Sequence, residues 1–149
     1  MKSISKLFLL PFMVIIAANS NAQINRSSRP CLFASYSSTI PTSLAELDKA
    51  FSIQPGASVK FRFSNTFSFS GTVISSVKKY NNLSTVLVKS PSFNNALLCL
   101  SKRINDDNSI TYVGRIINEK YADGYELAKD NAGNYSFTKI KTEDLIQDF

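Results

Sequence analysis

Alternation of apolar and polar residues with a period of two is the feature that most restricts the fold of this chain. In residues 59–64 three apolar side chains alternate with three polar ones, as in a strand with one buried face. No segment between the later apolar stretches is long enough for a crossover helix, which excludes a parallel α/β sheet. We therefore predict a mainly β fold, a single antiparallel barrel or sandwich of about seven strands. The predicted strands cover residues 59–63, 67–78, 85–89, 97–103, 110–118, 125–129 and 135–140.

One short helix is expected before these strands. Ser43, followed three residues later by Glu46, has the spacing of a capping box and predicts a helix over residues 43–53. Pro55 and Gly56 end it. A second short helix is predicted for the final segment, 142–149. The mainly β domain, including both predicted helices, is expected to span residues 43–149.

The N-terminal segment has the layout of an export signal. Lys2 and Lys6 precede an apolar run over residues 7–18, and small residues, Ser20 and Ala22, follow it. A membrane-spanning helix needs about 20 apolar residues, more than this run provides. We expect cleavage after residue 22 and a secreted or periplasmic product. The alternative is a retained N-terminal anchor helix.

Cleavage changes the composition of the remaining chain. Removal of residues 1–22 from the 149-residue chain takes away two lysines and no acid, so the formal charge falls from +6 to +4. A scattered charge of this size is typical of a soluble protein, although it also suits anionic surfaces. Residues 23–42, rich in serine and arginine, show no sustained period. This composition predicts an irregular N-terminal arm that includes at most a short strand near residues 32–36.

The two cysteines predict a disulfide bond. Cys31 and Cys99 both follow the signal segment, and export leads to a compartment in which disulfides persist. A bridge would close a span of about 69 residues and stabilise the fold by roughly 4 kcal/mol at most. The alternative is two buried free thiols, because Cys99 lies inside the apolar run 97–100.

The chain contains no histidine, which excludes every histidine-based triad and every imidazole metal site. Neither cysteine has a histidine to activate its thiol. We therefore expect no cofactor, no metal and no catalytic residue. An alternative is a small hydrolase that uses carboxylates, for which Asp106, Asp107 and Glu126 are the candidates. Asp106 and Asp107 also suit a turn between two strands.

The predicted function is binding without catalysis. Tyr121 and Tyr125 flank a predicted turn at 123–124, and Tyr112 and Arg115 lie on the preceding strand. Aromatic residues and arginine are enriched at interfaces, so these four residues are the predicted binding site. The expected partner is a protein, a glycan or the envelope surface, and one specific form is an inhibitor or prosegment-like partner of an exported protease. Nucleic acid is not expected, and neither is a membrane span after signal cleavage.

Overall fold

The computed structural model describes residues 29–146. The predicted signal peptide and the last three residues of the predicted C-terminal helix lie outside these described residues. The described chain is mainly β with one short α-helix, which confirms the predicted fold class. Its elements are β1 (Thr39–Thr42), α1 (Leu44–Lys49), η1 (Ala50–Ser52), β2 (Ser58–Arg62), β3 (Ser68–Tyr80), β4 (Leu83–Ser90), η2 (Pro91–Phe93), β5 (Ala96–Ile104), β6 (Ile110–Ile117), β7 (Asp123–Lys129), β8 (Tyr135–Lys141) and η3 (Asp144–Ile146).

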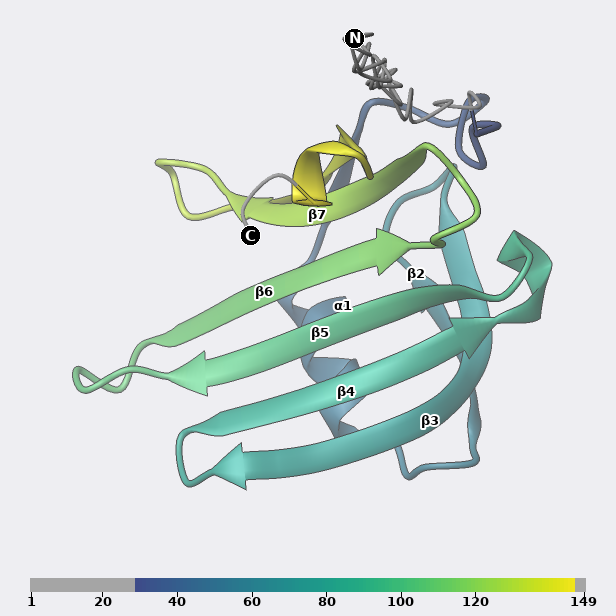
Figure 1. The fold of residues 1–149 in the computed structure, drawn as a ribbon. Coiled ribbons are helices and arrows are strands. Elements are labelled where there is room, and N and C mark those ends of the chain that lie inside the picture. The colour runs from purple at the N-terminus through teal and green to yellow at the C-terminus, as the bar shows by residue number, and fades with distance from the viewer. Residues whose placement is uncertain (1–28, 147–149) are drawn as a thin grey trace, which may run out of the picture.

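All eight strands belong to one antiparallel sheet in the order β1-β8-β7-β6-β5-β4-β3-β2. Strands β2 to β8 follow one another as a meander, and β1 pairs with the far edge of β8. The sheet curls into a half-barrel, so that α1 and β2 lie behind the front strands in Figure 1. The curl creates an inner face that packs around the core and an outer face that is turned to solvent.

The curl depends on the long strand β3. At Gly71 a Cβ atom would lie 2.3 Å from the backbone oxygen of Lys89 on β4, so only glycine allows the two backbones to approach this closely. A shift in register between Val73 and Ser75 marks a β-bulge in the same strand. Bulges bend a strand and increase its twist. These two features let β3 pair with β4 at the front and with β2 behind.

Helix α1 covers the free edge of β2. The Glu46 carboxylate accepts a hydrogen bond from the Arg62 backbone N–H at 3.0 Å, and Lys49 Nζ donates to the Lys60 carbonyl at 2.8 Å. An unpaired edge strand is a template for the addition of another strand. Side chains of α1 therefore occupy backbone groups that a further strand would need. The serine half of the capping box forms, since Ser43 Oγ accepts from the Glu46 N–H at 3.2 Å.

The N-terminal arm is part of the core. Phe33 is completely buried, and its ring centroid lies 5.1 Å from that of Tyr125 and 5.3 Å from that of Phe93. The buried carboxylate of Asp123 accepts hydrogen bonds from the backbone N–H groups of Leu32 at 2.6 Å and Phe33 at 2.9 Å. These contacts hold the arm against the end of the half-barrel where β7 begins.

Seven of the eight strands correspond to predicted ones, and three local differences remain. Strand β1 lies inside the predicted arm of residues 23–42, where Pro41 and three residues of mixed polarity gave no periodic signal. The predicted turn at 123–124 is wrong, because these residues begin β7 and the turn lies at 119–122. Asp123 is buried there as an acceptor for the arm. At the C-terminal end, the described part of the predicted helix contains only the short 3-10 turn η3.

Candidate functional site

The outer face of strands β3 to β6 carries large apolar side chains although it does not pack on the core. On the inner face Val86, Val88, Leu98 and Leu100 are at most 1 % exposed. In a strand, successive side chains point to opposite faces, so the residues between them point outward. We call these outward residues the outer face. Its members on β3 to β6 are Thr72, Ser75, Val77, Tyr80, Leu83, Thr85, Leu87, Lys89, Leu97, Cys99, Ser101, Arg103, Thr111, Val113, Arg115 and Ile117.

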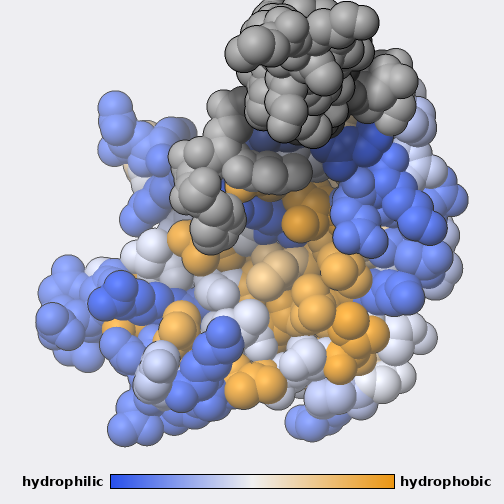
Figure 2. Space-filling model, viewed as in Figure 1, coloured by the Kyte–Doolittle hydropathy of each residue, from blue (hydrophilic) through white to orange (hydrophobic). Residues whose placement is uncertain are grey.

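Several large side chains of this face are open to solvent. Tyr80 is 68 % exposed, Val113 57 % and Val77 48 %, and Ile74 beside them in the bulge of β3 is 47 % exposed. Figure 2 shows apolar residues gathered over β4 and β5, with hydrophilic residues around them. Contiguous apolar patches on a small monomer commonly mark interaction sites. The outer face is therefore the leading candidate for a binding surface.

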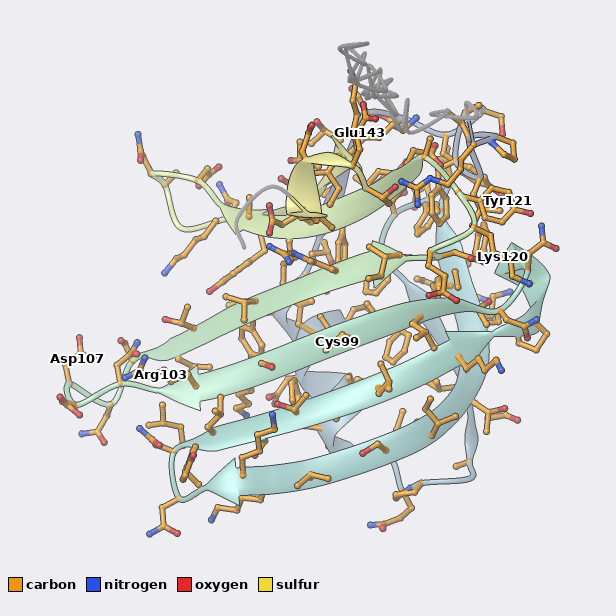
Figure 3. The ribbon with its side chains drawn as sticks, viewed as in Figure 1. Cys99, Arg103, Asp107, Lys120, Tyr121 and Glu143 are labelled. Carbon is orange, nitrogen blue, oxygen red and sulfur yellow. The ribbon has the colours of Figure 1, made fainter. Side chains whose placement is uncertain are left out.

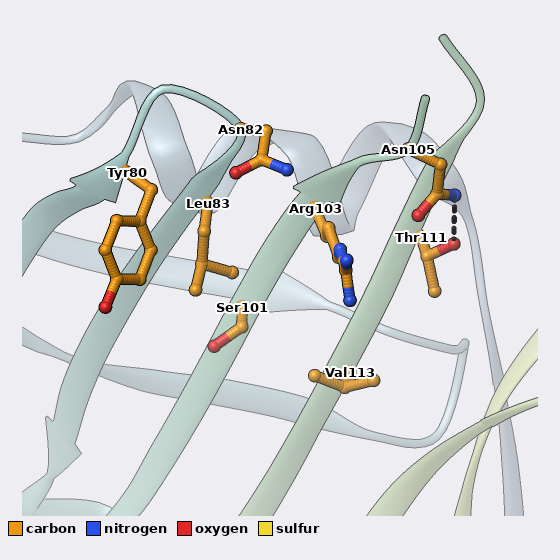
Figure 4. A pocket seen from close by; sticks show the side chains of 8 residues that line it. All are labelled: Tyr80, Asn82, Leu83, Ser101, Arg103, Asn105, Thr111 and Val113. Carbon is orange, nitrogen blue, oxygen red and sulfur yellow. Dashed lines mark hydrogen bonds between the residues drawn. The ribbon is translucent and has the colours of Figure 1, made fainter. Parts of the chain in front are cut away.

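A recess of about 620 Å³ lies at one end of the outer face (Figure 4). Strand register explains its composition. Leu83, Arg103 and Thr111 lie directly opposite one another on β4, β5 and β6, and Ser101 and Val113 form part of the next row along the strands. The residues that line the recess are Tyr80, Asn82, Leu83, Ser101, Arg103, Asn105, Thr111 and Val113.

Arg103 is the only charged residue that lines this recess. Within the described part of the chain, its guanidinium has no salt bridge within 4.0 Å and no hydrogen bond. The neighbouring Lys102 points to the opposite face and binds the carboxylate of Asp48. That hydrogen bond holds the pKa of Asp48 below its ordinary value. Lys102 is therefore paired within the fold, whereas the adjacent Arg103 is exposed to solvent.

Strands β3, β4 and β5 lie in a part of the sequence that has no acidic residue, and Asp106 and Asp107 follow it in the turn between β5 and β6. Residues 49–105 contain eight lysines and arginines and no aspartate or glutamate. The charged members of the outer face are Lys89, Arg103 and Arg115, and only Arg115 is paired, with Glu126 at 2.7 Å. Lys78 and Lys79 are exposed at the end of β3. The net charge of +6 therefore understates how strongly the cations are concentrated here. This acid-free stretch is the sequence signal that would have located the surface.

Two of the four predicted binding residues point into the core. Tyr112 is 5 % exposed, and its hydroxyl donates to the Asp48 carboxylate at 3.0 Å. Burial, followed by the negative charge and hydrogen bond of Asp48, raises the pKa of Tyr112 to about 12. Tyr125 is fully buried and donates to the Ser37 carbonyl at 2.6 Å. Burial, and then the charge of Asp123, raises its pKa to about 12 as well. Neither ring is accessible to a partner in this fold.

The other two predicted residues lie apart from one another. Arg115 belongs to the outer face, where both of its hydrogen bonds go to Glu126 Oε1, at 2.7 and 2.9 Å. Tyr121 is half-buried in the turn before β7 and accepts from Asn94 Nδ2 at 2.7 Å. Figure 3 shows Tyr121 at the opposite end of the sheet from Arg103. Of the predicted four, the structure thus retains Arg115 on the candidate surface.

The predicted disulfide is not formed in this structure, which has Cys31 and Cys99 as free cysteines. Cys99 lies in the middle of β5 on the outer face, as Figure 3 shows. Cys31 precedes Leu32, which is held by Asp123 at the start of β7. Strands β5 and β7 are separated by β6 and hence by about 10 Å, given a strand spacing of about 4.8 Å. A disulfide requires Cα atoms within about 7 Å.

Of the candidate carboxylates of the hydrolase alternative, Asp106 and Asp107 share the turn between β5 and β6, and Glu126 lies apart from them on β7. Asp107 accepts hydrogen bonds from the N–H and hydroxyl of Ser109 in the turn between β5 and β6. Glu126 binds Arg115, which lies five residues beyond Ile110 on β6 and hence about 17 Å along that strand. Among residues 29–146 no group of three or more Cys, Asp or Glu side chains could hold a metal ion. The structure therefore brings Glu126 together with neither aspartate, and both aspartates are exposed in their turn.

None of the helices within residues 29–146 has the length and apolar character needed to cross a membrane. Comparison with protein-family models, with curated proteins and with solved structures finds no match for this chain. The functional interpretation therefore depends on the outer face and its recess.

Proposed function

We propose that the chain is an exported, non-enzymatic binding module whose outer face recognises a partner protein. The observation that carries this proposal is the exposure of Val77, Tyr80 and Val113 on a sheet whose core is complete without them. Full burial of a side chain of this size stabilises a protein by roughly 1.5–3 kcal/mol. Association with another protein would bury them and recover that stabilisation.

The shape of the surface favours a protein over the other partners expected from the sequence. A membrane surface is best engaged by apolar side chains that protrude into it, whereas Arg103 and its neighbours line a recess. The lining includes aliphatic residues, Leu83 and Val113, and one exposed aromatic ring, Tyr80. Such walls suit the aliphatic side chains of a polypeptide better than the hydroxyl groups of a glycan. An exported protease is one candidate partner.

The proposed export and the separation of the acids both support binding over catalysis. The N-terminal layout favours export, and the absence of histidine removes the usual general base. A binding module needs only a rigid surface, which the paired strands β3 to β6 supply.

The test is affinity capture from the native envelope and extracellular fractions with matched variants. Val113→Asp places a charge in the centre of the exposed patch, and Ala132→Asp places the same charge in the exposed turn between β7 and β8. We expect the wild type and Ala132→Asp to retain the same protein and Val113→Asp to lose it by at least about ten-fold. Circular dichroism checks that both variants are folded. Equal capture by Val113→Asp and the wild type would refute the proposed surface.

A further inference from the structure

The geometry of the recess points to a specific contact, which rests on the proposed function: we infer that Arg103 binds an aspartate or glutamate side chain in an extended segment of the partner. Arg103 is exposed and without an ionic partner among the described residues, and it is the only charge in the recess. A guanidinium presents a planar pair of N–H donors that matches the two oxygens of a carboxylate. Asp106 and Asp107 in the adjoining turn form no salt bridge with Arg103, and Asp107 is bonded to Ser109 instead, so this guanidinium is available to an external anion.

A partner segment that reaches Arg103 must lie across the face of the sheet, because β5 is paired on both sides, with β4 and with β6. Addition of a strand at the edge formed by β2 is opposed by Glu46 and Lys49, which already bind the exposed backbone groups of that edge. The outer face, in contrast, has apolar side chains that are exposed and not covered by any described element. The contact is therefore made through side chains.

Strand geometry also defines the pattern that such a segment would carry. Along β5 the outward residues after Arg103 are Ser101 and Cys99, each about 6.8 Å further along. An extended peptide repeats its same-side residues at the same interval. Thr85 and Val113 border Ser101, and Leu87 and Arg115 border Cys99, so each position has one aliphatic neighbour, Val113 or Leu87. The matching segment has an acid followed by apolar residues at the second and fourth positions beyond it.

Two synthetic peptides of matched length test this contact. The first is acetyl-Glu-Thr-Val-Thr-Leu-amide, and the second has glutamine in place of glutamate. Binding to the isotope-labelled protein after signal removal is measured from amide chemical-shift changes. We expect the glutamate peptide to shift residues 101–113 and to bind about ten-fold more tightly than the glutamine peptide, a difference of about 1.4 kcal/mol, because a guanidinium forms a charged, two-point contact with a carboxylate and not with an amide.

Two variants of equal charge change make the result specific. Arg103→Gln removes the proposed contact, and Lys120→Gln removes an exposed cation at the other end of the sheet (Figure 3). Arg103→Gln should abolish the preference for glutamate, whereas Lys120→Gln should keep it. Raising the salt concentration should weaken binding of the glutamate peptide more than that of its glutamine counterpart.

Three outcomes would overturn the inference. The first is equal binding of the two peptides, or an unchanged preference in Arg103→Gln. The second is failure of both peptides to bind the outer face. The third is Arg103-dependent binding to phosphatidylglycerol vesicles without binding of either peptide, which would assign the recess to a lipid headgroup. Capture by a further variant, Val77→Asp, decides the proposed function separately, because Val77 is exposed on the outer face and does not line the recess around Arg103.

Discussion

The two faces of β5 carry similar apolar side chains, but only the inner face packs on the core. Leu98 and Leu100 point inward and are at most 1 % exposed, whereas Leu97 and Cys99, which alternate with them, point outward and are half-buried. Across the outer face, exposure increases from the middle of β5 to Val113 on β6 and Tyr80 on β3. The fold explains the apolar character of the inner face completely. It gives no reason for the apolar character of the outer face, and this difference is what directs attention to binding.

Two adjacent cations of β5, Lys102 and Arg103, also differ in whether the fold supplies a partner for them. Lys102 on the inner side is held by Asp48 and lies 6.0 Å from the centroid of the Phe51 ring. Arg103, the next residue, faces outward without such a partner in the described chain. Lys102 contributes to the stability of the fold because Asp48 supplies its counter-ion. Arg103 has no counter-ion among the described residues, so an anion that binds it would come from a partner.

The largest expected difference between the faces comes from a pair of adjacent leucines. Leu98→Ala should reduce the free energy of unfolding by about 3 kcal/mol, since it removes a completely buried side chain and leaves a cavity. Leu97→Ala should cost less than about 1 kcal/mol, because this side chain is half-buried on the outer face. Urea unfolding of both variants gives the comparison. Equal losses would mean that the outer face contributes to the core.

The attachment of the arm to the inner side should depend on Asp123. Asp123→Ala leaves the buried backbone N–H groups of Leu32 and Phe33 without their acceptor, at an expected cost of about 2–3 kcal/mol. Asp123→Asn keeps one oxygen acceptor and should cost less. Limited proteolysis provides a second readout, because the alanine variant should be cleaved faster within residues 29–38. Unchanged proteolysis would contradict the assigned role of this carboxylate.

Alkaline pH should distinguish the inner tyrosines from the outer one. Tyr112 and Tyr125 have a pKa of about 12 in the folded protein, compared with about 10 in the unfolded chain. Above pH 10 the unfolded chain loses these protons first, so the free energy of unfolding should fall between pH 10 and 12, by up to about 2 kcal/mol for each tyrosine.

Two phenylalanine variants test whether a buried tyrosine causes this alkaline loss of stability. Tyr112→Phe should reduce the alkaline loss of stability, whereas Tyr80→Phe, which alters a ring that is 68 % exposed, should leave it unchanged. Chemical unfolding measured at pH 9, 10, 11 and 12 gives the slope for each variant. The same slope in Tyr112→Phe and the wild type would show that Tyr112 does not cause the loss.

The smallest effect on stability is expected at the centre of the outer face. Val77→Ser and Val113→Ser should change the free energy of unfolding by no more than about 0.5 kcal/mol, since both side chains are about half exposed. Thermal unfolding followed by circular dichroism measures this change. A loss of more than about 1.5 kcal/mol in either variant would mean that these residues stabilise the fold, and the functional interpretation of their exposure would fail.

Sequence reasoning located most of the sheet, and two of its four binding candidates are residues that the fold buries, for identifiable reasons. The alternation in residues 59–64 and the polar turns set the strands, because a half-buried strand repeats every two residues. Strand β1 has four residues and a proline, too few for a period to be visible. Asp123 and Gly124 have the composition of a turn, but the burial of Asp123 depends on backbone N–H groups 90 residues or more away.

The binding surface required knowledge of which face of each strand is covered. Tyr112 and Tyr125 have interface-type side chains, yet the register of β6 and β7 turns them toward the core. A shift of one residue in either strand would have reversed this outcome.

The sequence alone determined the antiparallel β architecture, the capped helix before it and the exclusion of histidine chemistry, because these depend on local periodicity and composition. The tertiary structure decided three further features: the separation of the cysteines, the burial of the tyrosines and the recess around Arg103. Each depends on the curl of the sheet, which brings distant residues together and selects the face that remains in contact with water.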